Sequence, residues 1–478
     1  MTPDRARLVR RLLIAVGGFV GILIVTGAVA WGYLFYSRAS AYWQLVNGLN
    51  VIREKGEPLG GEKLDEFYRI PEGEADFTES VVTALTPFSD EMLGSDAKRL
   101  RELTLAKNLK LPVRSADWPD FVEAQERCRK YRGELDELRS VLDTPGSARF
   151  SLDYSRGLVE GVRFEHLTPI VSAHRLLILQ SLCNFYQGNT DLAIDDVVKL
   201  MQLAELVRHE PFSISQLIRK IIWDAANSLV AFFAHNDQLS FESISKVRHI
   251  ASNATFDNAY YLSSIGERAI TFESLKLNFG NLDWEEPRSP EADELPTYKL
   301  DPVSSATTMR YFTMHVEASK LPWDVAVDEV ELVRTQIERE MAANEKIWPE
   351  MTRDYVTPYL YAPLHRTFQM SLQAEAERRA ILVVCAIEWY QHRNNKLPTR
   401  LSDLVPEYIA SIPADPVDKQ PLRYATDKNG YAVYSIGLNR SDDQGRVGRD
   451  STGQCPDFGL SLPLPANAPL EAAASIPE

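Results

Sequence analysis

The stretch LLIAVGGFVGILIVTGAVAWGYLFY, from Leu12 to Tyr36, holds no charged residue. As an α-helix, this stretch is long enough to cross about 30 Å of hydrocarbon. Trp31 and Tyr33 lie near its end, where amphipathic aromatic rings favour a membrane interface. The sequence therefore predicts a transmembrane helix over residues 12–36.

The charges that precede this stretch predict its orientation. Basic residues outnumber acidic ones there, at Arg5, Arg7, Arg10 and Arg11. The positive-inside rule therefore places residues 1–11 in the cytoplasm and the rest of the chain outside it. A cleaved secretory signal is the competing interpretation, because Ala28-Val29-Ala30 has the small-x-small form that a signal peptidase accepts. Both interpretations export the body of the protein.

The composition of the 478 residues is that of a folded, acidic protein. Hydrophobic residues make up 45% and charged residues 25%, which is the balance of a globular chain. The 67 acidic and 52 basic residues give a formal charge of -15, which repels a phosphate backbone. We therefore expect no nucleic-acid partner.

Four cysteines lie far apart in the sequence, at Cys128, Cys183, Cys385 and Cys455. They form no CxxC pair, so neither a structural zinc site nor a dithiol redox motif is predicted. Up to two disulfides are possible, and the sequence does not choose among the three pairings. Buried free thiols are the alternative for the cysteines on helical patterns.

Apolar spacing predicts a mostly α-helical domain over residues 133–365. Residues 37–132 mix short helical patterns with glycine- and proline-containing stretches, and they are predicted as an irregular lead-in. Beyond them, apolar residues recur at intervals of three and four residues. This spacing predicts helices at 166–187, 190–208, 213–234, 240–252, 323–348 and 366–393. Helix pairs joined by short turns resemble helical hairpins of the tetratricopeptide type.

Residues typical of helix caps and loops support these helices. Asn189 or Thr190 is expected to cap the helix that follows it, and Ser213 with Gln216 reads as a capping box. The acidic, proline-rich stretch 283–302, DWEEPRSPEADELPTYKLDP, predicts a solvated loop inside the helical domain.

The character of the chain changes near Leu397, where short β-type runs alternate with turn residues. Strands are predicted at 422–424 and 431–435, joined by Asp427-Lys428-Asn429-Gly430, because Asn-Gly favours the positive φ of a tight hairpin. Residues 366–465 are thus expected to form a small α+β module with an antiparallel sheet, and residues 466–478 a flexible tail.

This module resembles the C-terminal half of the major pseudopilin of type II secretion systems. The ordered series is the helix AERRAILVVCAIEWYQHRNNKLPT (376–399), then SDLVPEYIASIPADP, PLRY, the NGYAVYSIGLN hairpin and the acidic DDQG loop. Residues 37–365 separate the membrane segment from this helix, whereas a pseudopilin has one continuous element. The resemblance therefore implies a pilin-like fold in a bacterial inner-membrane protein with a periplasmic body, without polymerisation into a pseudopilus.

The resemblance also implies a calcium site, because pseudopilins bind calcium in the acidic loop after the last hairpin. The matching positions are Asp442, Asp443, Asp450 and Asp457. Ca²⁺ takes six to eight oxygen ligands from flexible loops, which carboxylates and carbonyls could supply. Gln444-Gly445 replaces the usual glycine pair of the family.

Motifs of catalysis are lacking in the sequence. No HExxH, GxSxG, Walker-type or dinucleotide-binding pattern occurs. The leading hypothesis is a non-enzymatic, membrane-anchored scaffold or interaction protein outside the cytoplasm, with protein partners in secretion or envelope assembly. The alternative is a hydrolase-like envelope enzyme whose active site is built from residues distant in sequence.

Overall fold

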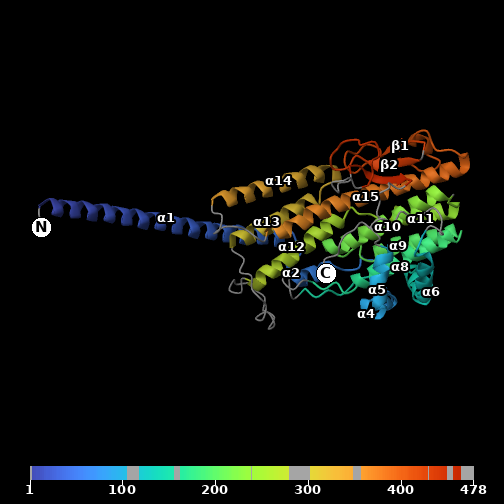
Figure 1. Cartoon of the computed structure of the whole chain (residues 1–478), viewed down its shortest axis with the longest axis horizontal. Helices are drawn as coiled ribbons and strands as arrows, with labels where there is room; N and C mark the ends of the chain where they lie inside the picture. Colours follow the sequence, from blue (N-terminus) through green and yellow to red (C-terminus); the bar gives the residue numbers. More distant parts are fainter. Residues whose placement is uncertain are drawn as a thin grey trace.

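The computed structural model describes residues 3–104, 118–154, 162–237, 239–278, 302–347, 357–428, 430–448 and 456–463. The predicted fold class is confirmed in its coarse form: the described chain is mostly α-helical, with a three-stranded antiparallel sheet near the C-terminus (Figure 1). A single long helix projects from one end of the body.

The helices follow one another with short connections. They are α1 (Pro3–Glu54), α2 (Gly60–Phe67), α3 (Thr78–Leu85), η1 (Thr86–Phe88), α4 (Asp90–Leu93), α5 (Ser95–Thr104), α6 (Phe121–Lys130), α7 (Arg132–Leu142), α8 (Leu167–Tyr186), α9 (Thr190–Glu205), α10 (Ser213–Asn236), α11 (Phe241–Asn253), α12 (Ala259–Asn278), α13 (Pro302–Ala318), α14 (Trp323–Ile347), α15 (Thr357–Asn394) and η4 (Leu401–Leu404). The strands are β1 (Arg423–Thr426), β2 (Tyr431–Ser435) and β3 (Phe458–Leu462).

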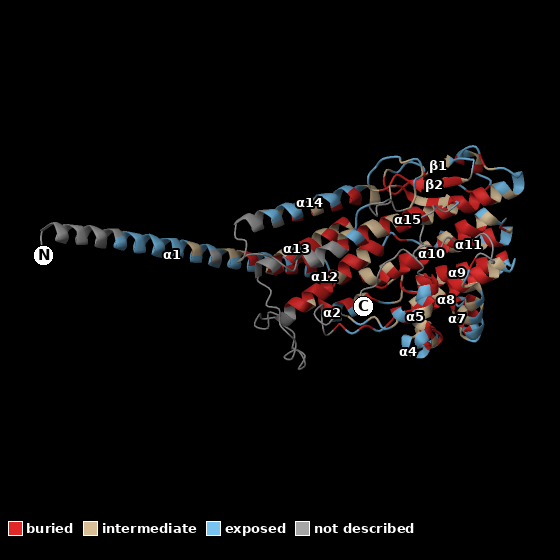
Figure 2. Cartoon of the chain, viewed as in Figure 1, coloured by how far each residue is buried: buried red, intermediate tan, exposed pale blue. Residues whose placement is uncertain are grey.

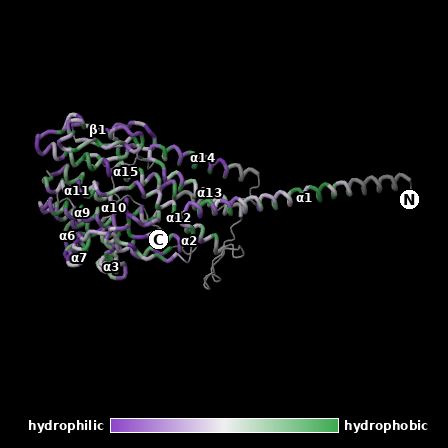
Figure 3. The backbone as a smooth tube through the Cα atoms, turned by 180° about the vertical axis from the view of Figure 1, so that it is seen from behind, coloured by the Kyte–Doolittle hydropathy of each residue, from purple (hydrophilic) through white to green (hydrophobic). Residues whose placement is uncertain are grey.

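Helix α1 contains the predicted membrane segment and extends beyond it in both directions. Its apolar window is long enough to cross a membrane and none of it is buried (Figures 2 and 3). The later turns behave differently, because Leu45, Leu49 and Ile52 are buried against side chains of α12 and α13. One unbroken helix therefore joins the exposed apolar segment to the body.

The described part of residues 37–132, the range predicted as an irregular lead-in with short helical patterns, is largely helical. It consists of the end of α1 and the short helices α2 to α6. Glycines with positive φ at Gly56, Gly73 and Gly94 separate several of these helices. Each short helix offers few repeats of the 3.6-residue period, so turn residues dominate the sequence pattern.

The predicted helices of the body are present as α8 to α11, α14 and α15, most within two residues of the expected ends. The predicted capping box of Ser213 and Gln216 does not form. The N-cap of α10 is Phe212, and the Gln216 amide donates instead to the carbonyls of Val207 (3.1 Å) and Glu210 (2.9 Å). The backbone N–H of Ser213 donates to the Glu267 carboxylate on α12 (3.2 Å).

Helix α15 is the element on which the C-terminal sheet packs (Figure 1). The sheet has the order β1-β2-β3 and is antiparallel throughout, with Tyr434 opposite both Arg423 and Gly459. β3 also contacts α10, and Val433 and Leu460 belong to the main hydrophobic core of the helical body. The sequence predicted β1 and β2, but not β3.

Candidate functional site

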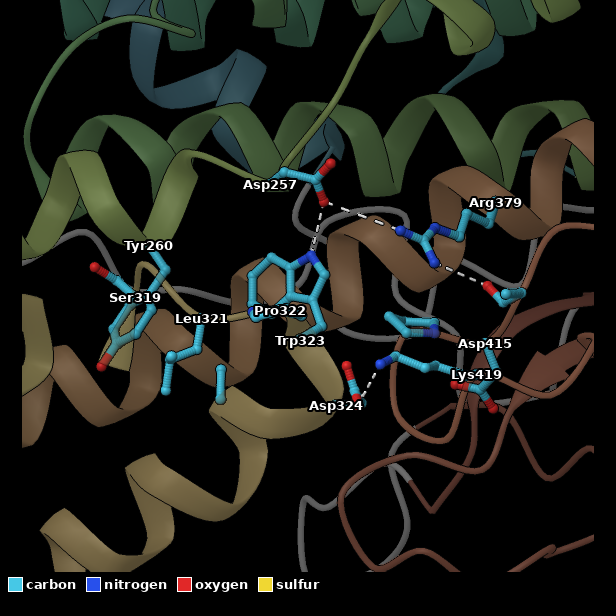
Figure 4. Close-up of a pocket in the computed structure, with 13 residues that line it drawn as sticks. Asp257, Tyr260, Ser319, Leu321, Pro322, Trp323, Asp324, Arg379, Asp415 and Lys419 are labelled. Atoms are coloured by element: carbon cyan, nitrogen blue, oxygen red, sulfur yellow. Dashed lines mark hydrogen bonds and ion pairs between the residues drawn. The ribbon is translucent and has the colours of Figure 1, made fainter. Parts of the chain in front are cut away.

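A cleft of about 290 Å³ opens where the helical body meets the loop before β1 (Figure 4). Its walls come from the start of α12, the α13–α14 turn, the middle of α15 and residues 414–419. The lining residues are Asp257, Tyr260, Ser319, Leu321, Pro322, Trp323, Asp324, Ala326, Arg379, Ala414, Asp415, Pro416 and Lys419.

Trp323 forms the central aromatic wall of this cleft (Figure 4). It is the first residue of α14, and the carbonyl of the preceding Pro322 accepts hydrogen bonds from the first turn. The indole Nε1–H donates to Oδ1 of Asp257 at 2.7 Å. The ring also packs on Phe368 of α15, with centroids 5.9 Å apart. These contacts fix the plane of the indole.

Arg379 lies above Trp323 and is held from several sides. Its Nε donates to Glu375 (2.7 Å), and its Nη1 donates to the carbonyl of Ala414 (2.9 Å). Its Nη2 lies 4.0 Å from Oδ1 of Asp257. Glu375 is fully buried; burial opposes its ionisation, but hydrogen bonds and charges from Arg378 and Arg379 lower its pKa overall.

A second ion pair crosses the cleft below Trp323. Nζ of Lys419 lies 2.8 Å from Oδ2 of Asp324, and the lysine side chain is 65% exposed. Exposed pairs of this kind contribute about 0–1 kcal/mol, so a bound ligand could exchange either partner at little cost. This pair and the hydrogen bond from Arg379 to the Ala414 carbonyl connect the helical body to the loop of the C-terminal module.

Asp415 anchors that loop to the sheet. Its carboxylate is fully buried and accepts hydrogen bonds from the backbone N–H of Val417 (2.8 Å) and Ile436 (3.1 Å) and from the Ser435 hydroxyl (2.7 Å). Arg423 of β1 pairs with the same carboxylate. The position of Lys419 is thus tied to strands β1 and β2.

The arrangement suits binding better than acid–base catalysis. Asp257, Asp324 and Asp415 each already accept from a cation, an indole or backbone N–H groups. Drug-sized ligands usually occupy pockets of about 300–1,000 Å³, so this cleft lies at the lower limit. It has room for one or two side chains, between an aromatic wall and two ion pairs.

The structure brings together three of the four residues predicted to bind calcium. The Asp457 carboxylate accepts from the backbone N–H of Asp443 (3.3 Å) and Gly445 (2.9 Å). Asp442 accepts from the Tyr434 hydroxyl at 3.0 Å. Asp450 lies outside the described residues.

These carboxylates are already engaged within the loop. Burial, together with the charges of Asp443 and Asp442, raises the pKa of Asp457 to about 6, although its two backbone hydrogen bonds oppose the rise. Over the described ranges, no group of three or more His, Cys, Asp or Glu side chains is placed to hold a metal ion. The calcium site stays a prediction.

Sequence patterns did not point to the cleft. Trp323 and Asp257 lie 66 residues apart, and neither belongs to a motif. The only local hint was the turn-rich IPADP segment, residues 412–416, which the sequence placed in the C-terminal module.

Comparisons with protein-family models, with curated proteins and with solved structures found no match to this chain.

Proposed function

We propose that this chain is a single-pass, membrane-anchored interaction protein of a bacterial inner membrane, with its body in the periplasm. The observation that carries the proposal is α1, one unbroken helix whose apolar window, from Val16 onward, has no buried residue and whose last turns pack into the body. Exposed apolar surface of that length is costly in water and favourable in a bilayer.

The orientation follows from the charge asymmetry around the apolar segment. The arginines before Leu12 favour a cytoplasmic N-terminus, so the body is held on the other side. Because Leu49 and Ile52 are buried in the body, the helix fixes the body close to the membrane surface instead of tethering it through a loose linker.

The cleft around Trp323 is the proposed docking site for a protein partner of the envelope, in secretion or envelope assembly. Leu321 lines the cleft and is 39% exposed, and Val325 on the first turn of α14 is 44% exposed. Interfaces commonly centre on an aromatic residue surrounded by polar groups, which is the arrangement of Trp323 between its two ion pairs.

A reporter fused to the C-terminus tests the location. A periplasm-dependent enzyme such as alkaline phosphatase is expected to be active on the full chain, and a cytoplasm-dependent fluorescent protein is expected to be dark. The fusion should pellet with membranes and be released only by detergent. Activity in the soluble fraction without detergent would contradict anchoring, and mass determination of the N-terminus would then reveal signal cleavage.

A photo-crosslinking residue at Leu321 tests the docking site, with the same residue at Val82 of α3 as the matched exposed control (46% exposed). We expect adducts with secretion or pilus components from the Leu321 position alone. Trp323→Ala should remove these adducts while leaving the amount of protein in the membrane unchanged. Equal adducts from both positions would contradict a specific cleft.

A further inference from the structure

Two cysteines that are distant in sequence meet in the core of the helical body. Cys128 lies on α6 and Cys183 on α8, and both are buried thiols. Both belong to one hydrophobic core and lie on helices that pack on each other, and the Cys183 side chain is the largest cause of the raised pKa of Cys128. Cys385 is also buried, but it lies on α15, and Cys455 is outside the described residues.

Independent contacts hold α6 against the last turns of α8 (Figure 1). The ring of Tyr186 lies 5.8 Å from that of Trp118 and 5.9 Å from that of Phe121. Cys128 and Cys183 are 4% and 2% exposed. The meeting of the two sulfur atoms is therefore set by a packed helix pair and not by an exposed loop.

We propose that Cys128 and Cys183 form a disulfide bond that ties α6 to α8 in the exported protein. The proposal rests on the proposed function for its oxidising compartment, because disulfides persist outside the cytoplasm and are rare within it. Of the three pairings that the sequence left open, the contact selects the one that joins these two residues, which leaves Cys385 and Cys455 as the other two.

The reaction needs a disulfide-carrying oxidant, which we name by class as a thiol–disulfide oxidase of the envelope. One cysteine thiolate attacks the disulfide of the oxidant and forms a mixed disulfide. The second cysteine thiolate then displaces the oxidant and forms the Sγ–Sγ bond. Two electrons and two protons pass from the cysteines to the oxidant, which leaves with two thiols.

The environment predicts when this reaction occurs. The neighbouring Cys183 thiol, together with burial, raises the pKa of Cys128, so the folded Cys128 thiol rarely ionises. Because the thiolate is the attacking species, we expect oxidation before α6 packs on α8. Once the helices have packed, the same burial should shield the bond from reductants.

Thiol trapping of the full-length chain in cells tests the proposal. Cells are quenched in acid, the protein is denatured and alkylated, and peptides are mapped with and without reduction. We expect a disulfide-linked peptide pair that contains Cys128 and Cys183. The pair should persist in the matched variant Cys385→Ala and be missing from Cys128→Ala. A mild reductant added to the folded, detergent-solubilised protein should leave the bond intact.

A second experiment tests the Cys128–Cys183 pairing independently of the periplasmic location. Reduced, denatured protein is refolded in a glutathione redox buffer and mapped in the same way. Failure to form the Cys128–Cys183 bond there would overturn the pairing, whatever the compartment. A bond that forms on refolding but is missing in cells would support the pairing and contradict the periplasmic location. Reduction of the bonded protein should lower Tm by roughly 4 °C, from the entropy of the opened loop.

Discussion

Glu388 on α15 is a carboxyl group that the fold holds away from water. It is 7% exposed, and its Oε1 accepts a hydrogen bond from the Tyr431 hydroxyl at 2.6 Å. Burial raises the pKa of Glu388 to about 7, although the Tyr431 bond opposes the rise. The unfolded value is ~4.3, so the folded state binds more protons between these two pH values. The free energy of unfolding therefore falls as pH rises through that window.

Replacing Glu388 with glutamine should remove this pH dependence. The amide oxygen can still accept from Tyr431, and the side chain stays neutral at every pH. Relative to the unsubstituted protein, we expect Glu388→Gln to be more stable at pH 8 by about 1–3 kcal/mol, and equally stable near pH 4.5. Denaturant unfolding at several pH values measures the difference.

Glu407 gives the matched control, because its side chain is 62% exposed and pairs with Arg393 at the surface. Glu407→Gln should follow the pH profile of the unsubstituted protein within ~0.5 kcal/mol. Glu377, whose pKa burial raises, adds a slope of the same sign in every variant. Parallel profiles for Glu388→Gln and the unsubstituted protein would show that Glu388 is ionised in the folded state.

The partners of single residues were the least predictable part of this protein. Asp257 and Trp323 look like ordinary loop and helix-start residues in the sequence, and only the packing of α12 and α14 on α15 brings them into one cleft. Likewise, Cys128 and Cys183 could have paired in other ways. Hydrogen-bond and thiol partners depend on tertiary contacts, which periodicity does not encode.

At the scale of elements, prediction succeeded where a repeat was long. Helices α8 to α11 offer several turns of apolar spacing each, and the sequence located them within a few residues. It missed α2 to α6, which are short and separated by turn residues, and β3, which lies beyond the acidic loop. Two longer helices, α12 and α13, were missed as well. A five-residue strand offers only two or three alternations, so its pattern is easily missed.

The last turns of α1 are expected to stabilise the body. Leu49 is 1% exposed and packs among Phe272, Leu275 and Met309. Leu49→Ala removes this packing and leaves a cavity, which should lower the free energy of unfolding by about 2–5 kcal/mol. Val51→Ala is the matched control on the same helix, because Val51 is 46% exposed and should change stability by less than ~0.5 kcal/mol. Equal effects in denaturant unfolding would mean that α1 does not pack on the body.

At the scale of the whole molecule, the C-terminal sheet is not a separate domain. Val433 and Leu460 share one hydrophobic core with α8 to α10. Helix α15 packs on α10 and α11 of the helical body and also on β2 and β3. The predicted boundary at residue 366 therefore falls inside α15. The pilin-like resemblance stays a prediction for a helix with a sheet packed on it, and here α10 covers that sheet as well.

Two truncations separate the proposed anchoring role of α1 from its packing role. Removal of residues 1–36 deletes the apolar segment, in which no described side chain is buried. This variant, made without its export route, should be soluble without detergent. When both proteins also carry Cys128→Ala, so that neither holds the proposed disulfide, it should unfold at the same Tm as the detergent-solubilised full chain. Removal of residues 1–54 also deletes Leu45, Leu49 and Ile52, so it exposes the apolar surface of α12 and α13 that they cover. The longer deletion should lower Tm by several degrees or aggregate. If both truncations were equally stable, α1 would be a tether alone, and the fixed placement of the body at the membrane surface would lose its physical basis.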